Sequence, residues 1–443
     1  MRFLNLKHGA RRVCRSCAPL AVSTVLLAFV AACATAPPQS RGPYEIVGYY
    51  AGWKGPIAID ARQLTVLNYA FLDICWDGEH GNAAAGGVFR CRDIGGSEMR
   101  PPNGSVVVDN PALDAANFAR LRALREAHPH LRLVASVGGW TRSNRFSDMA
   151  ADERTRASFI ASVVAFLREQ RFDGIDLDWE YPGSIGVRCA PGGNNCDRAT
   201  DKANFVLLAR GLRAALDAAG AADGKRYLST IAAGADADFV YDAGSGAWLA
   251  ELAKSLDWIN LMTYDYHGTW ESRAGFVAPL YRDAADPTPL KNADASVALF
   301  LEQGIPRDKL TLGQPFYGKG WGECSPGPNG DGLYQDCAGP LADPPEAAFE
   351  FATLAEKGYL APDAAGKYTR GGLGFTRHWN KSARVPYLYN PATRIFISYD
   401  DEESIREKNR YVIEKRLRGA MFWELNADRH RVLGTIVSED LPH

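Results

Sequence analysis

Eight short apolar runs recur between residues 45 and 425, and segments with helical periodicity separate several of them. The runs are EIVGYY, TVLNYAFL, LRLVASVGG, FDGIDLDWE, YLSTIAA, LDWINLMTYD, LTLGQPFYG and GAMFWEL. In ERTRASFIASVVAFLREQ, between the third run and the fourth, Phe159, Val163 and Leu167 recur at helical spacing. This alternation predicts an α/β fold with a parallel sheet, and eight strands favour a (β/α)8 TIM barrel over an open doubly wound sheet. The open sheet typically has a glycine-rich phosphate-binding turn after its first strand, and none follows EIVGYY.

The stretch from Lys319 to about Arg394 breaks this alternation, because it separates the seventh strand from the last helix. It is rich in Gly, Pro and aromatic residues. A loop of this length without structure of its own is uncommon in a compact domain, so we expect a small inserted domain. The predicted organisation is residues 44–318 for the first part of the barrel, 319–394 for the insertion and 395–443 for the second part of the barrel.

The N-terminal segment is typical of an export signal. Basic residues precede the apolar run APLAVSTVLLAFVAA, which is shorter than the about 20 residues of a transmembrane helix. The run ends in Val-Ala-Ala-Cys at residues 30–33, which resembles a bacterial lipobox, where the cysteine is lipidated and becomes the first mature residue. We predict a signal peptide over residues 1–32, a lipid anchor on Cys33 and a tether over 33–43. An ordinary cleavage site beside an incidental cysteine is the alternative.

Six cysteines follow Cys33, and an even number in an exported protein indicates disulfides. The sequence alone leaves their connectivity open, although their close spacing favours three local pairs. These pairs are Cys75–Cys91, Cys189–Cys196 and Cys324–Cys337. Metal binding is the competing interpretation, but these cysteines show no CxxC spacing and the histidines form no HExxH motif. We therefore expect no metal site and no cofactor.

The fourth apolar run, within RFDGIDLDWEYP at residues 171–182, contains an unusual number of acids. Because strand side chains alternate between two faces, Asp176, Asp178 and Glu180 share one face, and the intervening Trp179 points to the core. Neighbouring carboxylates on one face lie about 6 to 7 Å apart, repel each other and, when buried, favour their protonated forms. The run therefore predicts a site that supplies proton donors. A structural hydrogen-bond network or a calcium site is the alternative, but calcium takes about six to eight oxygen ligands, usually from loops.

The charge balance excludes one class of partner. The formal net charge is -2, so there is no electrostatic argument for nucleic-acid binding.

Tryptophans gather at the carboxyl ends of the predicted strands, where a TIM barrel places its functional residues. They are Trp53, Trp76, Trp140, Trp270, Trp321 and Trp423. Loops have no core to cover so many indoles, and indole faces stack well on the apolar faces of pyranose rings. We therefore expect a carbohydrate-binding groove along the rim of the barrel.

FDGIDLDWEYP resembles the DxxDxDxE signature of glycoside hydrolase family 18 chitinases. The similarity extends along nearly the whole mature chain, through SVGGW (136–140), MTYDYHG (262–268), QPFYGKGW (314–321), VPYLYN (385–390) and GAMFWEL (419–425). Each motif is short, but together they follow the family's order at successive strand ends. The resemblance implies that the insertion is the α+β domain of the larger bacterial chitinases. One departure is Lys319, where these enzymes commonly have Arg, and a lysine is a point charge rather than a planar fork.

The resemblance also implies a retaining, substrate-assisted reaction. Glu180 would protonate the glycosidic oxygen, while the N-acetyl carbonyl of the sugar on the non-reducing side attacks its own anomeric carbon. Asp178 would hydrogen-bond the acetamido N–H and stabilise the oxazolinium charge, and Asp176 would share a proton with Asp178. Tyr264 would position the acetamido group from the other side. These four residues are the expected catalytic set.

Further residues would contact the substrate or support the acids if the resemblance holds. Trp423 would form the floor under the distorted sugar, and Tyr181 and Trp140 would line the leaving-group side. Ser136 and Tyr49 would support the buried aspartates, although ordinary barrel packing is an equal alternative for both. The full predicted substrate-binding set is Tyr49, Phe71, Ser136, Gly139, Trp140, Tyr181, Met262, Asp265 and Trp423.

Two other functions are compatible with this family. A chitin lectin typically lacks the acid at the position of Glu180, which this chain keeps. An endo-β-N-acetylglucosaminidase acting on glycoprotein glycans uses the same acidic motif but generally lacks the inserted domain. The resemblance therefore favours chitin or chitooligosaccharides as the substrate. We expect a monomer. The N-terminal signal predicts either an outer-membrane lipoprotein, held in the bacterial cell envelope by its lipid anchor, or a secreted protein.

Overall fold

The computed structural model describes residues 43–184, 186–187, 196–241, 247–341 and 349–443. The predicted signal peptide, Cys33 and nearly all of the predicted tether lie outside the described residues, as does Cys189. No helix within the described ranges is long and apolar enough to span a membrane.

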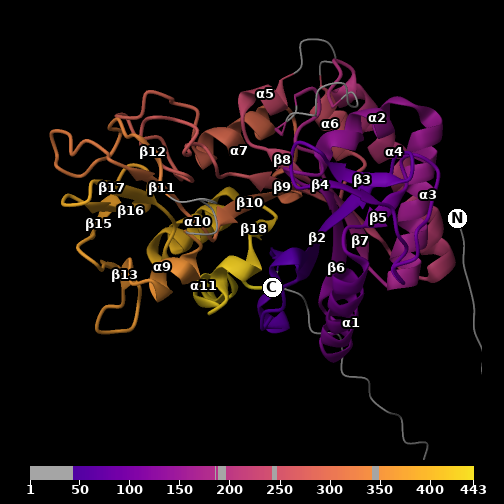
Figure 1. The fold of residues 1–443 in the computed structure, drawn as a ribbon, viewed down its shortest axis with the longest axis horizontal. Coiled ribbons are helices and arrows are strands. Elements are labelled where there is room, and N and C mark those ends of the chain that lie inside the picture. Colours follow the sequence, from indigo (N-terminus) through magenta and orange to yellow (C-terminus); the bar gives the residue numbers. More distant parts are fainter. Residues whose placement is uncertain (1–42, 185, 188–195, 242–246, 342–348) are drawn as a thin grey trace, which may run out of the picture. The chain divides into compact units, whose positions relative to one another are not determined.

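Within the described residues, eight parallel strands close into a barrel (Figure 1). They are β1 (Glu45–Ala51), β2 (Val66–Ile74), β6 (Arg132–Gly138), β7 (Gly174–Asp178), β8 (Leu228–Gly234), β9 (Trp258–Met262), β10 (Leu310–Pro315) and β18 (Gly419–Trp423). Each strand pairs with its neighbours in this order, and β1 closes the ring by pairing with both β2 and β18. Each of the eight apolar runs coincides with most of one of these strands, so the predicted TIM barrel is confirmed. A further strand, β5 (Val106–Val108), pairs antiparallel with the end of β2.

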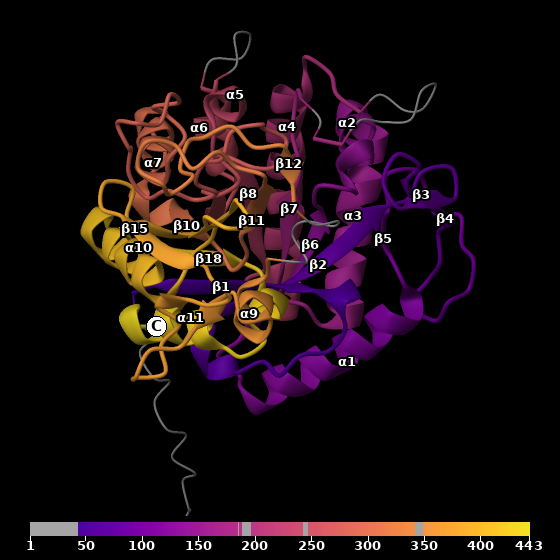
Figure 2. The ribbon, with the colours of Figure 1, turned by 60° about the vertical axis from the view of Figure 1, so that its left-hand side comes forward.

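Helices lie outside the barrel strands (Figures 1 and 2). The helices in the barrel part of the chain are α1 (Pro111–Ala127), α2 (Phe146–Ala151), α3 (Glu153–Gln170), α4 (Asp201–Asp223), α5 (Ala237–Val240), α6 (Trp248–Ala253), α7 (Ala293–Glu302), α10 (Glu402–Lys415) and α11 (Val432–Asp440). Helix α3 coincides with the predicted amphipathic segment: the side chain of Asp152 accepts a hydrogen bond from Arg154 N at its start, and the left-handed Arg171 ends it. Its buried Phe159, Val163 and Leu167 belong to the core between strands and helices.

The insertion contains its own antiparallel sheet and core. The sheet has the order β12 (Gly339–Pro340), β11 (Lys319–Gly322), β17 (Ile395–Ser398), β16 (Val385–Asn390) and β15 (Thr376–Asn380). The segment also contains α9 (Phe351–Glu356) and the short pair β13 (Leu360–Ala361) and β14 (Arg370–Gly371). Buried Trp321, Tyr389 and Phe396 pack together in its core.

The sheet of the insertion continues to Ser398 through β17, because β17 pairs with both β11 and β16. Helix α10 follows the insertion, and β18 and the short α11 come after it.

Two of the three predicted disulfides are present among the described residues. Cys75–Cys91 brackets a hairpin of β3 (Glu79–Asn82) and β4 (Gly87–Arg90), and Cys324–Cys337 lies at the start of the insertion. The third predicted pair includes Cys189 and so lies outside the described residues. The hairpin and the insertion both follow the carboxyl ends of barrel strands, which is the face where a barrel places its functional loops.

Candidate active site

The acids of β7 point into the barrel at its carboxyl end, as the alternation predicts. Asp176 is fully buried, and Asp178 and Glu180 are almost fully buried. Trp179 points the opposite way, where it stacks on Phe146 at 5.3 Å between ring centroids. The strand and the two residues after it therefore place three carboxyl groups toward the interior and use their apolar residues to pack against the helices.

Asp176 lies in a complete cage of hydrogen-bond donors. Its Oδ2 accepts from Tyr49 Oη and Ser136 Oγ, both at 2.8 Å. Its Oδ1 accepts from Thr230 Oγ1 at 2.6 Å and Asn260 Nδ2 at 3.3 Å. Burial raises the pKa of Asp176, while these donors oppose the rise. Tyr49 and Ser136 thus hold the carboxyl group directly and do more than fill space.

Asp178 and Glu180 differ from Asp176 because fewer donors hold them. Oδ1 of Asp178 is buried and has no hydrogen-bond partner among the described residues. Burial, then the charges of Glu180 and Asp176, raise the pKa of Asp178 well above its usual range. Burial and the nearby Asp265 also raise the pKa of Glu180, to about 7, against a lowering hydrogen bond from Tyr181. A carboxyl group with this pKa holds a proton for general acid catalysis near neutral pH.

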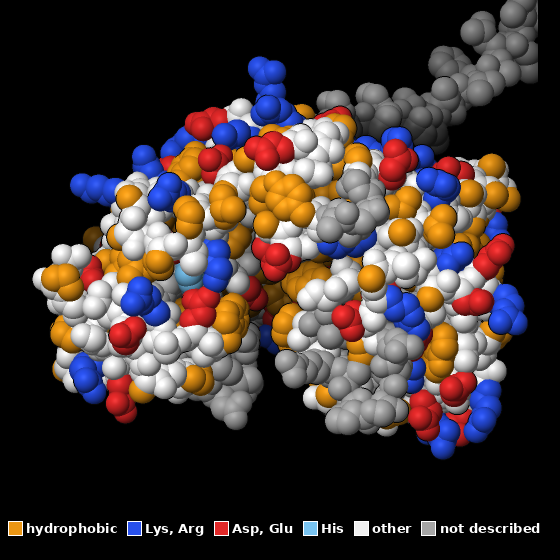
Figure 3. Space-filling model, turned by 90° about the horizontal axis from the view of Figure 1, so that it is seen from above, with side chains coloured by type: hydrophobic (Ala, Val, Ile, Leu, Met, Phe, Trp, Pro, Cys, Tyr) orange, Lys and Arg blue, Asp and Glu red, His pale blue; other side chains and the backbone are white. Residues whose placement is uncertain are grey.

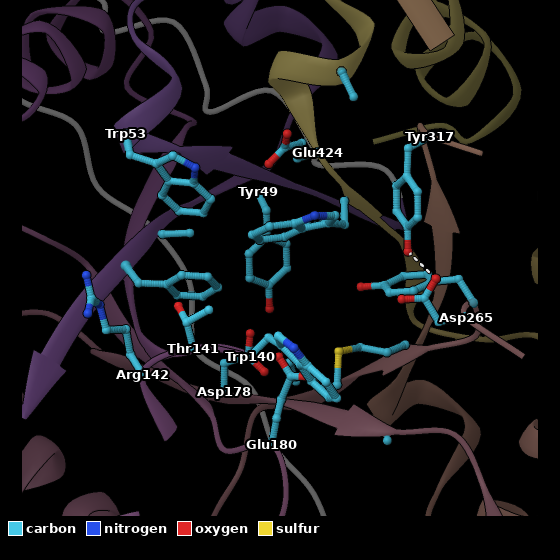
Figure 4. A pocket seen from close by; sticks show the side chains of 18 of the residues that line it. Tyr49, Trp53, Trp140, Thr141, Arg142, Asp178, Glu180, Asp265, Tyr317 and Glu424 are labelled. Carbon is cyan, nitrogen blue, oxygen red and sulfur yellow. Dashed lines mark hydrogen bonds between the residues drawn. The ribbon is translucent and has the colours of Figure 1, made fainter. Parts of the chain in front are cut away.

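A second group of side chains faces these acids from β9 and the start of the insertion. Tyr264 and Asp265 follow β9, and Tyr317 Oη donates to Asp265 Oδ1 at 2.9 Å (Figure 4). Nζ of Lys319 lies 3.4 Å from the same oxygen. Lys319 also lies over the rings of Trp270 and Tyr317, at 5.2 and 5.4 Å from their centroids. The predicted Tyr264 and Asp265 therefore share a cavity with Asp178 and Glu180.

Aromatic rings cover the opposite wall of the cavity. The rings of Trp53, Phe71 and Trp423 form a triangular cluster: Phe71 lies 5.8 Å from Trp53 and 5.5 Å from Trp423, and the two indoles lie 6.1 Å apart. Gly139 makes this cluster possible, since a Cβ at its position, where φ is +80°, would lie 2.4 Å from the Phe71 ring. The three rings form a surface suited to the apolar faces of sugars.

The cavity has a volume of about 1060 Å³. All the predicted substrate-binding residues line it except Ser136, which lies behind Asp176, and Gly139, which supports Phe71. Figure 3 shows a hollow on this face with hydrophobic side chains at its base and acidic side chains beside it. Figure 4 places Trp53 and Glu424 on one side of the pocket and Asp178 and Glu180 on the other.

The prediction that six tryptophans line the groove is correct for four of them. Trp53, Trp140, Trp270 and Trp423 line the cavity. Trp321 is instead fully buried in the core of the insertion. Trp76 packs at the rim under the guanidinium of Arg145, 5.4 Å from its ring centroid. A strand-end position therefore does not by itself separate an indole that binds a ligand from one that packs.

Several polar residues of the site were not predicted from the sequence. Thr230 and Asn260 complete the cage around Asp176. Lys54, Glu350 and Glu424 line the cavity at the end where Trp53 lies. A polar residue inside an otherwise apolar strand, as in YLSTIAA, was the available signal for the first two.

One group of side chains among the described residues has the spacing of a metal site. The possible ligand atoms of Asp73, His80 and Asp109 lie within 4.8 Å of one another. The guanidinium of Arg142 approaches both carboxylates, at 2.8 Å from Asp109 Oδ1 and 3.6 Å from Asp73 Oδ2. Since this arginine already supplies the positive charge, the group is a structural ion cluster at the cavity edge.

The fold and this constellation of acids agree with the comparison to known families. A protein-family model described as "Glycosyl hydrolases family 18" matches residues 45–428 of this chain. The chain therefore belongs to glycosyl hydrolase family 18.

Named relatives cover most of this chain. Chitinase A1 of Niallia circulans is 40% identical over 455 aligned positions, which cover 96% of this chain and 62% of that protein. Chitinase B of Serratia marcescens is 31% identical, covering 83% of this chain and 74% of that protein. The chain thus spans less than two thirds of the length of Chitinase A1.

Solved structures show the same architecture. Chitinase ChiA74 from Bacillus thuringiensis superposes with a TM-score of 0.79 at 39% identity, covering 91% of this chain and 70% of that one. A glycoside hydrolase family 18 N-acetylglucosaminidase from Paenibacillus barengoltzii has a TM-score of 0.71 at 32% identity, covering 90% of this chain and 100% of that one.

Proposed function

We propose that this protein is a chitinase that hydrolyses β-1,4 bonds between N-acetylglucosamine units. The observation that carries the proposal is the pair of Glu180 and Asp178 in one aromatic-lined cavity. The pKa of Glu180 is raised to about 7, and Asp178 beside it has a buried oxygen without a partner among the described residues. The names of the relatives support chitin as the substrate class.

The first step of the proposed reaction uses the proton of Glu180. Glu180 gives this proton to the glycosidic oxygen, and the bond from that oxygen to the anomeric carbon breaks. The carbonyl oxygen of the substrate's own acetamido group forms the new bond to the anomeric carbon, which gives an oxazolinium ion. Glu180 then takes a proton from a water molecule, which attacks the anomeric carbon and opens the oxazolinium ring. Because this carbon is inverted twice, its configuration is retained.

Asp178 is proposed to hold the acetamido group during this step. Its unpartnered Oδ1 accepts a hydrogen bond from the acetamido N–H, and its negative charge stabilises the oxazolinium ion. Asp176 shares a proton with Asp178, which offsets the repulsion between the buried carboxylates, and Tyr264 positions the acetamido group from β9. The residues proposed to contact the reacting sugar and the sugars on either side of it are Phe71, Trp140, Tyr181, Met262, Asp265 and Trp423.

The proposal distinguishes this chain from two related functions. A lectin would need no proton donor, whereas Glu180 is retained and buried in the cavity. A glycan-directed endo-β-N-acetylglucosaminidase generally lacks the insertion, whereas here the insertion contributes Lys319 and Glu350 to the cavity. Both observations favour chitin.

The test is a parallel assay on chitotetraose and a high-mannose glycopeptide. A chitinase cleaves chitotetraose alone, a glycan-directed enzyme cleaves the glycopeptide, and a lectin cleaves neither. Glu180→Gln, which keeps the shape but cannot supply the proton, should reduce the rate by about 100- to 10,000-fold. Cleavage of the glycopeptide alone, or full activity in the variant, would contradict the proposal.

We further propose that the protein is exported and acts as a monomer in the cell envelope, anchored through a lipid on Cys33. The basic and apolar N-terminal segment that ends in Val-Ala-Ala-Cys supports this placement. The division of the mature chain into a barrel and an inserted α+β domain is part of the same proposal.

A further inference from the structure

Trp53 is a half-exposed indole on a short loop, and the loop is held in place from several sides. The residue is 51% exposed, and its ring stacks on Phe71. The loop is the 3-10 turn η1 (Gly52–Lys54), between β1 and the stretch that leads to β2. Asn117 of α1 donates to Gly52 O at 3.1 Å. An indole so exposed depends on its backbone for its position, because few side chains pack against it.

Lys54, the residue after Trp53, holds the other side of the loop. Its Nζ lies 2.5 Å from Glu424 Oε1 and 2.6 Å from Glu350 Oε1. Glu424 directly follows Trp423, and Glu350 precedes α9 in the insertion. One ammonium group therefore joins three segments that are far apart in the sequence.

The carboxylates that face Lys54 are themselves fixed. Glu424 is 1% exposed. Arg429 donates to Glu350 Oε2 at 2.8 Å, which anchors the insertion side of the cluster. An ion pair with a buried and anchored partner holds a geometry better than an exposed pair, whose side chains remain free to move.

We propose that Lys54 is a positioning residue, which sets the place of the Trp53 indole relative to Phe71 and Trp423 for binding an N-acetylglucosamine chain. This inference rests on the proposed function. Trp53 and Trp423 lie 6.1 Å apart and both contact Phe71, and Lys54 and Glu424 are the residues that directly follow them. The ion pair thus joins the chain segments that carry the two indoles and fixes the distance between them.

The physical reason is preorganisation. Without Lys54 the loop loses one of its anchors and Trp53 becomes more mobile. Substrate must then order Trp53 as it binds, and the free-energy cost of this ordering lowers the affinity. This loss of an anchor weakens sugar binding but does not touch the proton transfer from Glu180. Substitution should therefore raise KM and leave kcat nearly unchanged.

The experiment is a double-mutant cycle of Lys54→Met and Trp53→Ala. Binding of chitotetraose is measured by calorimetry in the Glu180→Gln background, so that the sugar stays intact, and KM and kcat are measured in the active enzyme. Lys54→Met should raise Kd and KM by about tenfold and change kcat by less than about twofold. In the Trp53→Ala background the same substitution should change Kd by less than about twofold, because the indole that Lys54 positions is gone.

The matched control is Lys254→Met. Lys254 directly follows α6 and pairs with Glu251 at 2.5 Å on the surface, so this substitution removes an ion pair of the same length that does not line the cavity. It should leave Kd and KM unchanged. Lys54→Gln, which keeps a hydrogen-bond donor, is the second variant if Lys54→Met does not fold, and it should act in the same direction.

The outcomes separate this inference from the proposed function. If the Glu180→Gln protein with an intact Trp53 loop does not bind chitotetraose, the proposed substrate is wrong. If that protein binds but Lys54→Met has the parent affinity, the positioning role alone is wrong. Additive effects of Lys54→Met and Trp53→Ala would also overturn it, because they would mean that Lys54 acts independently of the indole.

Discussion

The ammonium of Lys319 lies 3.4 Å from Oδ1 of Asp265, so a buried cation partly neutralises this carboxylate. The charge of Asp265 raises the pKa of Glu180, together with the larger effect of burial. Lys319 stands where family 18 chitinases commonly have Arg. Its point charge thus sets how strongly Asp265 acts on the proposed proton donor.

The first prediction concerns the pH profile of Lys319→Met. Without the cation, the charge of Asp265 acts more strongly, and the pKa of Glu180 rises further above its ordinary value. Because Glu180 acts in its protonated form, activity is lost as pH rises through this pKa, so the alkaline limb of kcat/KM should move to higher pH. Asp265→Asn should move the same limb to lower pH.

The position of the limb is the measured quantity, because the loss of packing on Trp270 also lowers the height of the profile. Lys291→Met is the control, since Lys291 lines the same cavity but pairs with Glu271 at 2.6 Å. Its limb should not move. A shift of the Lys319→Met limb to lower pH would contradict the electrostatic argument.

The barrel was predictable because its signals are local. Strands buried on both faces give short apolar runs, and the helices between them repeat their apolar residues at 3.6-residue spacing. The side of the acids was predictable for the same reason: strand alternation alone places Asp176 and Asp178 on one face. The end of the insertion was less predictable, since β17 joins a sheet through pairing with distant strands.

The cage around Asp176 depends on register between strands, which no local pattern reveals. Asp176 is paired across the sheet with Ser136 on one side and Thr230 on the other. Ser136 was predicted through the family motif, whereas Thr230 lies in a run that resembles any buried strand. Lys54 and Glu424 meet only because β1 and β18 are neighbours when the barrel closes.

The second prediction concerns the disulfide between Cys75 and Cys91. The pair closes a loop with a sequence separation of 16 residues, and both cysteines are fully buried at the base of the β3–β4 hairpin. Replacing both by Ser should lower the free energy of unfolding by about 3 kcal/mol, mostly through the entropy of the unfolded chain. Denaturant unfolding at constant pH measures this. A loss below about 1 kcal/mol would show that the loop is constrained by its other contacts.

The third prediction concerns placement in the cell. If Cys33 carries the lipid, Cys33→Ala should release active enzyme from the membrane fraction, because the barrel begins only at Glu45. Specific activity should be unchanged, since the cavity lining begins with Tyr49 in the part of the chain that the structure describes. The measurement is chitotetraose hydrolysis in separated membrane and soluble fractions. Retention of the variant in the membrane fraction would exclude the lipid anchor.

The last prediction separates substrate assistance from a nucleophile on the enzyme. If the acetamido carbonyl attacks the anomeric carbon, an oligosaccharide whose sugar on the non-reducing side of the cleaved bond is deacetylated should bind but resist hydrolysis. Asp178→Asn should also lose activity, because the acetamido group is no longer held, although Glu180 keeps its proton. Trapping with a fluorosugar should give no covalent adduct on Asp176, whose two oxygens already accept hydrogen bonds from Tyr49, Ser136, Thr230 and Asn260, or on Asp178. Efficient cleavage after a glucosamine unit, or a glycosylated aspartate in the mass spectrum, would replace this mechanism with a two-carboxylate one while leaving the fold and the position of Glu180 unchanged.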